Sequence, residues 1–143
     1  MDQNKLTLSV LEKRFGIFKL NENSETHQEI PSWVYESSFF SITRTSEELS
    51  VVCEENSIPI GTTAERSWSC LKIEGPLDFG LTGILAGISQ VLANCRIPIF
   101  AISTYNTDYI LVREKNLESA VKALLDAGYV FSNKIKDYQI KKQ

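Results

Sequence analysis

The chain has 143 residues, 43% of them hydrophobic, and a formal net charge of -3. This length allows one domain or two compact subdomains, and the apolar content favours a folded chain. Acidic and basic residues are interspersed, which excludes the basic footprint of a nucleic-acid-binding protein. We read the lysines of the tail as a solvated end. These are Lys134, Lys136, Lys141 and Lys142.

The N-terminus has no apolar leader, and no apolar run reaches the roughly 18–20 residues of a membrane span. We therefore expect a cytoplasmic protein without membrane contact. The three cysteines, Cys53, Cys70 and Cys95, have long and unpatterned spacings. Such spacings indicate buried thiols and not a disulfide framework or a zinc site.

The sequence contains no recognisable set of catalytic residues. The single histidine, His27, lies in a polar segment, so any histidine-based triad would depend on it alone. We find no nucleophile paired with a base, no metal-ligand set, no Walker loop and no dinucleotide fingerprint. We therefore expect a protein that is not an enzyme and that has no catalytic residues, no metal and no cofactor.

In the first half of the chain, residues 6–20 contain β-prone segments that are interrupted at residues 12–14. Residues 30–36 are typical of a short helix, with Pro31 in its first turn. A hairpin follows, which we expect to consist of strands at residues 39–43 and 49–53. No second amphipathic helix is predicted after the hairpin, and residues 57–66 have the composition of an irregular connector.

The second half begins with a predicted strand at residues 69–74, which ends before Gly75 and Pro76. Asp78 then precedes a helix, where it could cap the helix or lie at its positive end. The helix is predicted by apolar residues at helical spacing, and Pro98 prevents its continuation. The stripe consists of Leu81, Ile84, Leu85, Ile88, Val91 and Leu92.

Residues 97–103 are apolar on both faces, so we expect a central, covered strand. Turn residues at 105–108 lead to a returning strand at residues 109–113. Asn116 is a predicted N-cap of a second helix, and Gly128 is its expected stop. The apolar face of this helix is made by Leu117, Val121, Leu124 and Leu125, and a last strand begins at Tyr129.

The two predicted hairpins have similar sequences. Residues 40–54 match residues 100–114 without a gap at an offset of sixty, and Phe40 matches Phe100. Such a repeat indicates two copies of one small unit. Strand–helix–strand–strand–helix–strand is the ferredoxin-like order, so we predict an α+β fold of two such units packed side by side. We expect the domains at residues 1–64, with a degraded first copy, and at residues 65–143.

Three segments resemble the ACT domain, and more closely the small bacterial proteins that consist of two tandem ACT-like units. They are residues 41–52, 75–86 and 99–112. The stretch that ends at Asp108 also resembles aspartate kinase regulatory regions and the tandem-ACT arginine sensors of animal cells. The resemblance spans residues 6–129 and implies a regulatory fold that binds a small molecule, most often an amino acid.

The resemblance also implies a place for the ligand, where the strand-to-helix loop of one unit faces a strand of its neighbour. The implied residues are Asp78, Phe79, Gly80, Thr82 and Gly83 in the loop, Ser103, Thr104, Tyr105 and Asp108 at the strand and turn, and Ser41, Ile42 and Thr43 on the facing strand. Asp108 matches a ligand-contacting acidic residue of the arginine sensors. Because the first unit lacks a full second helix, we expect one site.

The chemistry of these residues suits an amino acid, whose ammonium group needs a carboxylate and whose carboxylate needs N–H donors. Structural roles remain open for several of them. Asp78 could be only a cap, Asp108 only a turn residue, and Gly80 and Gly83 could serve helix packing.

We expect a non-enzymatic amino-acid-binding regulatory or sensor module, with a possible homodimer and an unidentified regulated protein as partners. The alternative is a protein-interaction or oligomerisation module that has lost its ligand.

Overall fold

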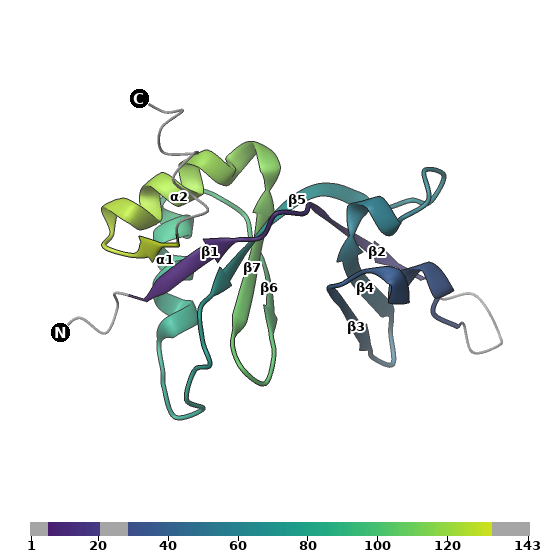
Figure 1. Ribbon diagram of the computed structural model, residues 1–143, viewed down its shortest axis with the longest axis horizontal. Helices are drawn as coiled ribbons and strands as arrows, with labels where there is room; N and C mark the ends of the chain where they lie inside the picture. Colours follow the sequence, from purple (N-terminus) through teal and green to yellow (C-terminus); the bar gives the residue numbers. More distant parts are fainter. Residues whose placement is uncertain (1–5, 21–28, 133–143) are drawn as a thin grey trace. The chain divides into compact units, whose positions relative to one another are not determined.

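The computed structural model describes residues 6–20 and 29–132. His27 and the lysine tail lie outside these residues. The chain forms two compact units (Figure 1). The N-terminal unit comprises residues 13–20 and 29–68, and the C-terminal unit comprises residues 6–12 and 69–132. The first strand thus belongs to the C-terminal unit, whereas the sequence suggested a division between residues 64 and 65.

The N-terminal unit has the ferredoxin-like order of elements, but both helices are replaced by short 3-10 turns. Its elements are β2 (Phe15–Lys19), η1 (Ser32–Glu36), β3 (Phe40–Arg44), β4 (Leu49–Glu54), η2 (Glu55–Ser57) and the first half of β5 (Glu65–Ile73). The strands are antiparallel in the order β3-β4-β2-β5. The prediction of a degraded copy with a hairpin and a short N-terminal helical turn is confirmed, and the turn is a 3-10 helix.

The C-terminal unit has the complete set of helices. Its elements are β1 (Thr7–Val10), the second half of β5, α1 (Ile84–Asn94), β6 (Phe100–Ser103), β7 (Asp108–Arg113), η3 (Glu114–Asn116), α2 (Leu117–Asp126) and β8 (Val130–Phe131). The strand order is β6-β7-β5-β1-β8. β1 is antiparallel to β5 and parallel to β8, so it lies between the first and last strands of the ferredoxin-like unit. The predicted α+β class is confirmed.

Both helices cover the same face of this sheet. Alternate residues of β5 and β7 point to one side, and they share a core with the apolar stripes of α1 and α2. The fully buried members include Leu71, Ile73, Ile110, Ile88, Leu92 and Leu124. Figure 1 shows α1 and α2 next to each other, and they pack against each other.

The helices of the C-terminal unit end in the same way on different residues. Gly128 has φ 102° and follows α2, as predicted, and the Tyr129 N–H donates to the Leu124 carbonyl at 3.0 Å. After α1 the corresponding position is Arg96, with φ 60°, and the Ile97 N–H donates to the Leu92 carbonyl at 3.0 Å. Both ends are Schellman motifs, in which a left-handed residue lets the chain close over the last turn.

Three predictions in this unit were wrong in detail. Among the described residues β6 pairs only with β7, and its residues are alternately half-buried and exposed, so β6 is an edge strand and not a central one. A proline shortly before the strand suits an edge position. α1 begins at Ile84 and not at Leu81. Asn116 occupies the N-cap position of α2, but its side chain makes no capping hydrogen bond.

The two hairpins are true counterparts, but the offset of sixty is wrong by one residue. Arg44 pairs with Leu49 beside the first turn, and Ser103 pairs with Asp108 beside the second. Arg44 therefore corresponds to Ser103 and not to Thr104. Because side chains alternate between the faces of a strand, a slip of one residue exchanges the faces.

Candidate functional site

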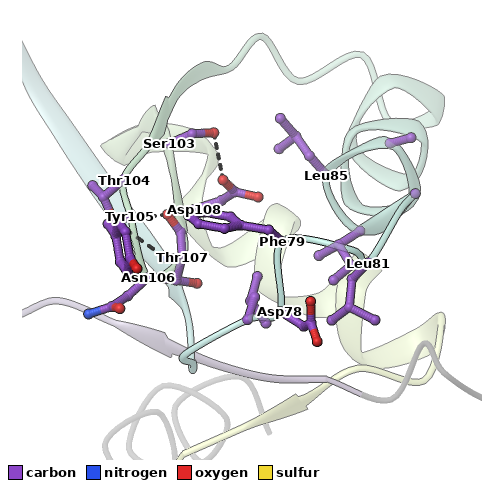
Figure 2. Close-up of a pocket in the computed structure, with 14 residues that line it drawn as sticks. Asp78, Phe79, Leu81, Leu85, Ser103, Thr104, Tyr105, Asn106, Thr107 and Asp108 are labelled. Carbon is purple, nitrogen blue, oxygen red and sulfur yellow. Dashed lines mark hydrogen bonds between the residues drawn. The ribbon is translucent and has the colours of Figure 1, made fainter.

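A cavity of about 400 Å³ lies within the C-terminal unit, between the segment that precedes and begins α1 and the turn that joins β6 to β7 (Figure 2). This volume is in the range of small-molecule pockets, about 300–1,000 Å³. The lining residues are Leu77, Asp78, Phe79, Leu81, Gly83, Ile84, Leu85 and Ala86 on one wall, and Ser103, Thr104, Tyr105, Asn106, Thr107 and Asp108 on the other.

The first wall is a loop that ends in the positive end of a helix. Gly83 is the N-cap of α1 and has φ 78°, a conformation that glycine adopts without steric cost. No side chain caps α1, and its first turn contains no acidic residue. The N–H groups at the start of a helix have no partner within the helix, and the helix dipole makes this end attractive for an anion. The cavity is lined by Ile84, Leu85 and Ala86, which carry these groups.

Asp78 shapes the loop and does not cap the helix, which corrects one of the roles considered for it. Its Oδ1 accepts a hydrogen bond from the Gly80 N–H at 2.7 Å, and its carbonyl accepts one from the Leu81 N–H at 3.0 Å. These bonds form a local turn that ends before α1 begins at Ile84.

The second wall presents a carboxylate that is held in place. The Ser103 hydroxyl donates to Asp108 Oδ1 at 2.6 Å, between directly paired residues at the end of the β6–β7 ladder. Figure 2 shows this hydrogen bond beside the Phe79 ring. Asp108 is the residue on this wall that can accept a cationic group. The lining residues include two carboxylates, Asp78 and Asp108, and no Lys, Arg or His.

The turn between β6 and β7 is held by its threonines. The Thr104 N–H donates to the Thr107 carbonyl at 2.8 Å, and the Thr107 N–H donates to Thr104 Oγ1 at 3.3 Å. The Thr107 hydroxyl is directed away from this turn and donates to the Ile73 carbonyl at 2.6 Å. The second wall is therefore attached to the end of β5.

Exposed apolar side chains surround the mouth of the cavity. Phe79 is 75% exposed and Tyr105 is 80% exposed, yet the two rings contact each other edge to face, with centroids 5.0 Å apart. Leu81 is 54% exposed. Grouped apolar side chains on a surface often mark a binding site. Here they belong to both walls, so the ring contact spans the mouth.

The cavity brings together many of the residues that the resemblance implied. Those that line it are Asp78, Phe79, Gly83, Ser103, Thr104, Tyr105 and Asp108. Gly80 and Thr82 lie in the same loop but do not line the cavity. Ser41, Ile42 and Thr43 lie on β3 of the N-terminal unit, so their part in a site stays a prediction.

Several lining residues were missed. Ile84 and Leu85 were assigned only to the apolar stripe of the helix. Their position at the start of the helix, beside the cavity, was therefore overlooked. Asn106 and Thr107 are ordinary turn residues in sequence, and nothing in their pattern indicates that the Thr107 hydroxyl is buried. The remaining missed residues are Leu77, Leu81 and Ala86.

Other sites are not evident within the described residues. These residues contain no group of three or more His, Cys, Asp or Glu side chains that could hold a metal ion. The helices of the described segments are too short or too polar to cross a membrane. Burial raises the pKa of the Cys70 thiol to about 12, and burial together with the neighbouring Glu54 raises that of Cys53 to about 11. Both thiols are therefore unreactive in the folded protein.

Several known proteins resemble this chain in sequence or in fold. The bovine (Bos taurus) cytosolic arginine sensor for mTORC1 subunit 1 is 31% identical over 97 residues, which cover 60% of this chain and 30% of the sensor. The chain thus spans less than a third of the length of that relative. The crystal structure of protein Atu0741 from Agobacterium tumefaciens is 36% identical, with a TM-score of 0.80, over 90% of this chain and 92% of that one.

The regulatory subunit of aspartate kinase from Thermus thermophilus, in its ligand-free form, has the same fold. Its TM-score is 0.59 at 13% identity, over 84% of this chain and 95% of that one. A family model of an N-terminal domain matches residues 13–61, which lie within the N-terminal unit. The family model of the ACT domain matches residues 63–126, which include the whole cavity. The chain therefore contains a domain of the ACT family at residues 63–126.

Proposed function

We propose that this chain is a non-enzymatic regulatory or sensor module that binds an amino acid in the cavity between the start of α1 and the β6–β7 turn. The observation that carries the proposal is the charge arrangement of the cavity. An uncapped helix N-terminus lies on one wall, and the Asp108 carboxylate lies on the other. An amino acid carries both complementary charges, a carboxylate and an ammonium group.

Each part of the ligand has a partner in this arrangement. The carboxylate would bind the N–H groups of Ile84, Leu85 and Ala86, where the helix dipole adds to the hydrogen bonds. The ammonium group would donate to Asp108, whose orientation is fixed by Ser103. The side chain of the ligand would pack against the apolar residues of the cavity, such as Leu85.

The family supports the same ligand class. One relative is named an arginine sensor, and one protein of the same fold is named a regulatory subunit. The chain covers only part of the sensor. That this module regulates a partner protein, and that it assembles as a homodimer, are therefore proposals as well. A participation of Ser41, Ile42 and Thr43 also belongs to the proposal.

A thermal-shift screen of the twenty amino acids, followed by calorimetry of those that respond, tests the function. A ligand that binds the folded state adds about 2.7 kcal/mol to the free energy of unfolding at 100 times its dissociation constant. We expect at least one amino acid to have this effect, and Asp108→Asn to reduce it. Stability that does not respond to any amino acid would contradict the proposal and favour an interaction module that lacks a ligand.

A further inference from the structure

The two walls of the cavity are joined to each other at its base. The Leu77 N–H, at the start of the loop wall, donates to the Asn106 carbonyl of the turn at 2.7 Å. The Thr107 hydroxyl donates to the Ile73 carbonyl at 2.6 Å, and the Thr107 residue is only 5% exposed. These two hydrogen bonds attach the β6–β7 turn to the chain on both sides of Gly75.

Gly75 allows this close approach because it has no side chain. A Cβ atom at this position would lie 3.0 Å from the Asn106 carbonyl oxygen and 3.2 Å from Thr107 Cβ. The first of these atoms belongs to the backbone, so it cannot move aside by a change of rotamer. Gly75 is not among the glycines with positive φ, which are Gly83 and Gly128. Its role is therefore to leave room and not to supply an unusual backbone conformation.

We propose that the contact between Gly75 and the turn at Asn106 and Thr107 sets the separation of the cavity walls, and that this separation determines ligand affinity. Gly75 does not line the cavity, and the Thr107 hydroxyl bonds to the backbone of β5. Gly75 is therefore a positioning residue that acts through Asp108 and the loop. Thr107 lines the cavity, but its hydroxyl is bonded to the Ile73 carbonyl, so this hydroxyl acts by holding the turn in place. The effect on affinity rests on the proposed function, whereas the effect on wall separation does not.

The ring contact between Phe79 and Tyr105 measures the wall separation without a ligand. Phe79 lies on the loop wall and Tyr105 on the turn wall, with ring centroids 5.0 Å apart. Rings at this distance give a nuclear Overhauser effect between their protons in an NMR spectrum of the full chain. We expect this signal to weaken in Gly75→Ala, because the added Cβ pushes the turn away from the loop by a few tenths of an ångström.

Two further variants and one control make the test specific. Thr107→Val removes the hydroxyl with little change of volume and should weaken the ring signal, whereas Thr107→Ser keeps the hydroxyl and should retain the signal. Val121→Ala is the control, because Val121 is a buried residue of α2 that does not line the cavity. It lowers stability and should leave the ring signal unchanged.

Affinity for whichever amino acid binds the parent chain is the second measurement. We expect Gly75→Ala and Thr107→Val to weaken binding about tenfold or more, and Thr107→Ser and Val121→Ala to stay close to the parent. A ring signal of unchanged intensity in both Gly75→Ala and Thr107→Val would overturn the inference. So would a weakened signal with unchanged affinity. If the parent binds no amino acid, the proposed function fails, while the ring signal still decides whether this contact sets the wall separation.

Discussion

The turns of the β3–β4 and β6–β7 hairpins have similar hydrogen bonds but are followed by different residues. In the first turn, Thr45 Oγ1 accepts hydrogen bonds from the Glu47 and Glu48 N–H groups, both at 3.1 Å. Thr104 has the same role in the second turn. The next paired position is Leu49 in the first hairpin and Asp108 in the second. The hairpin therefore does not require a carboxylate at this position, which favours a functional role for Asp108 over a structural one.

The two units are also similar in the 3-10 turn that follows each hairpin, and beyond this turn they differ. η2 follows β4 as η3 follows β7, and the next residues, Ile58 and Leu117, are both buried. After Leu117 the apolar residues recur at helical spacing and form α2. After Ile58 the chain contains Pro59 and Gly61, which oppose a helix. In its described residues, 13–20 and 29–68, the N-terminal unit keeps the strands and turns of the fold and contains no α-helix.

The separate cores of the two units predict separate unfolding, and this is the largest effect we expect. Leu124→Ala in the C-terminal core should cost about 2–5 kcal/mol and should speed the alkylation of Cys70 more than that of Cys53. Both thiols are fully buried and have raised pKa values, so each reacts only when its own unit opens.

Val34→Ala is the corresponding variant in the core of the N-terminal unit. It should speed the alkylation of Cys53 more than that of Cys70. Mass spectrometry of the labelled peptides measures both rates, and Cys95, which is exposed, gives the rate of an accessible thiol. If both variants speed both buried cysteines equally, the two units unfold as one.

Removal of a carboxylate at the end of each hairpin turn should affect ligand binding in one unit only. Asp108→Asn should weaken amino-acid binding by about 10- to 100-fold, because a hydrogen bond to a charged group contributes about 1.5–3 kcal/mol. Glu48→Gln removes an exposed carboxylate within the first turn, one residue before the position that corresponds to Asp108, and is the control, with no expected effect. Calorimetry measures both affinities, and equal affinities of the two variants would argue against Asp108 as a ligand-binding residue.

Removal of the turn threonines should separate the structural role from the functional one. Thr45→Ala and Thr104→Ala each lose hydrogen bonds that close a turn, so each should cost about 0.5–1.5 kcal/mol of stability. Only Thr104→Ala should also weaken ligand binding, because Thr104 lines the cavity. Hydrogen exchange of the two hairpins measures the local stabilities. A much larger loss at one turn would mean that the turns are less alike than their hydrogen bonds indicate.

The smallest expected effect concerns the left-handed residue that ends each helix of the C-terminal unit. Arg96 holds the left-handed position after α1 that Gly128 holds after α2. Arg96→Gly should therefore stabilise the C-terminal unit by about 0.5–1 kcal/mol, since glycine adopts this conformation without strain. Gly128→Ala should destabilise the same unit by a comparable amount. Urea unfolding followed by the Cys70 reaction checks both signs.

Local signals predicted much of this structure. The turn residues and alternating strands predicted both hairpins, and the apolar stripe with Gly128 predicted α2. Pairing between distant segments has no such signal, so neither the place of β1 between β5 and β8 nor the edge position of β6 could be foreseen. The family resemblance named the loop and Asp108, which line one cavity in the structure, and their part in ligand binding stays a prediction. The contact of Gly75 with the turn depends on the approach of two distant segments and is visible only in the structure.

An NMR titration of the isotope-labelled chain with the amino acid that binds it shows directly whether the ligand occupies the cavity. We expect the amide signals of residues 84–86 and 103–108 to move together along one saturable curve, with one ligand per chain, and Asp108→Asn to shift this curve to higher ligand concentrations. Binding that leaves these signals in place and moves amides elsewhere would contradict a ligand site between the start of α1 and the β6–β7 turn.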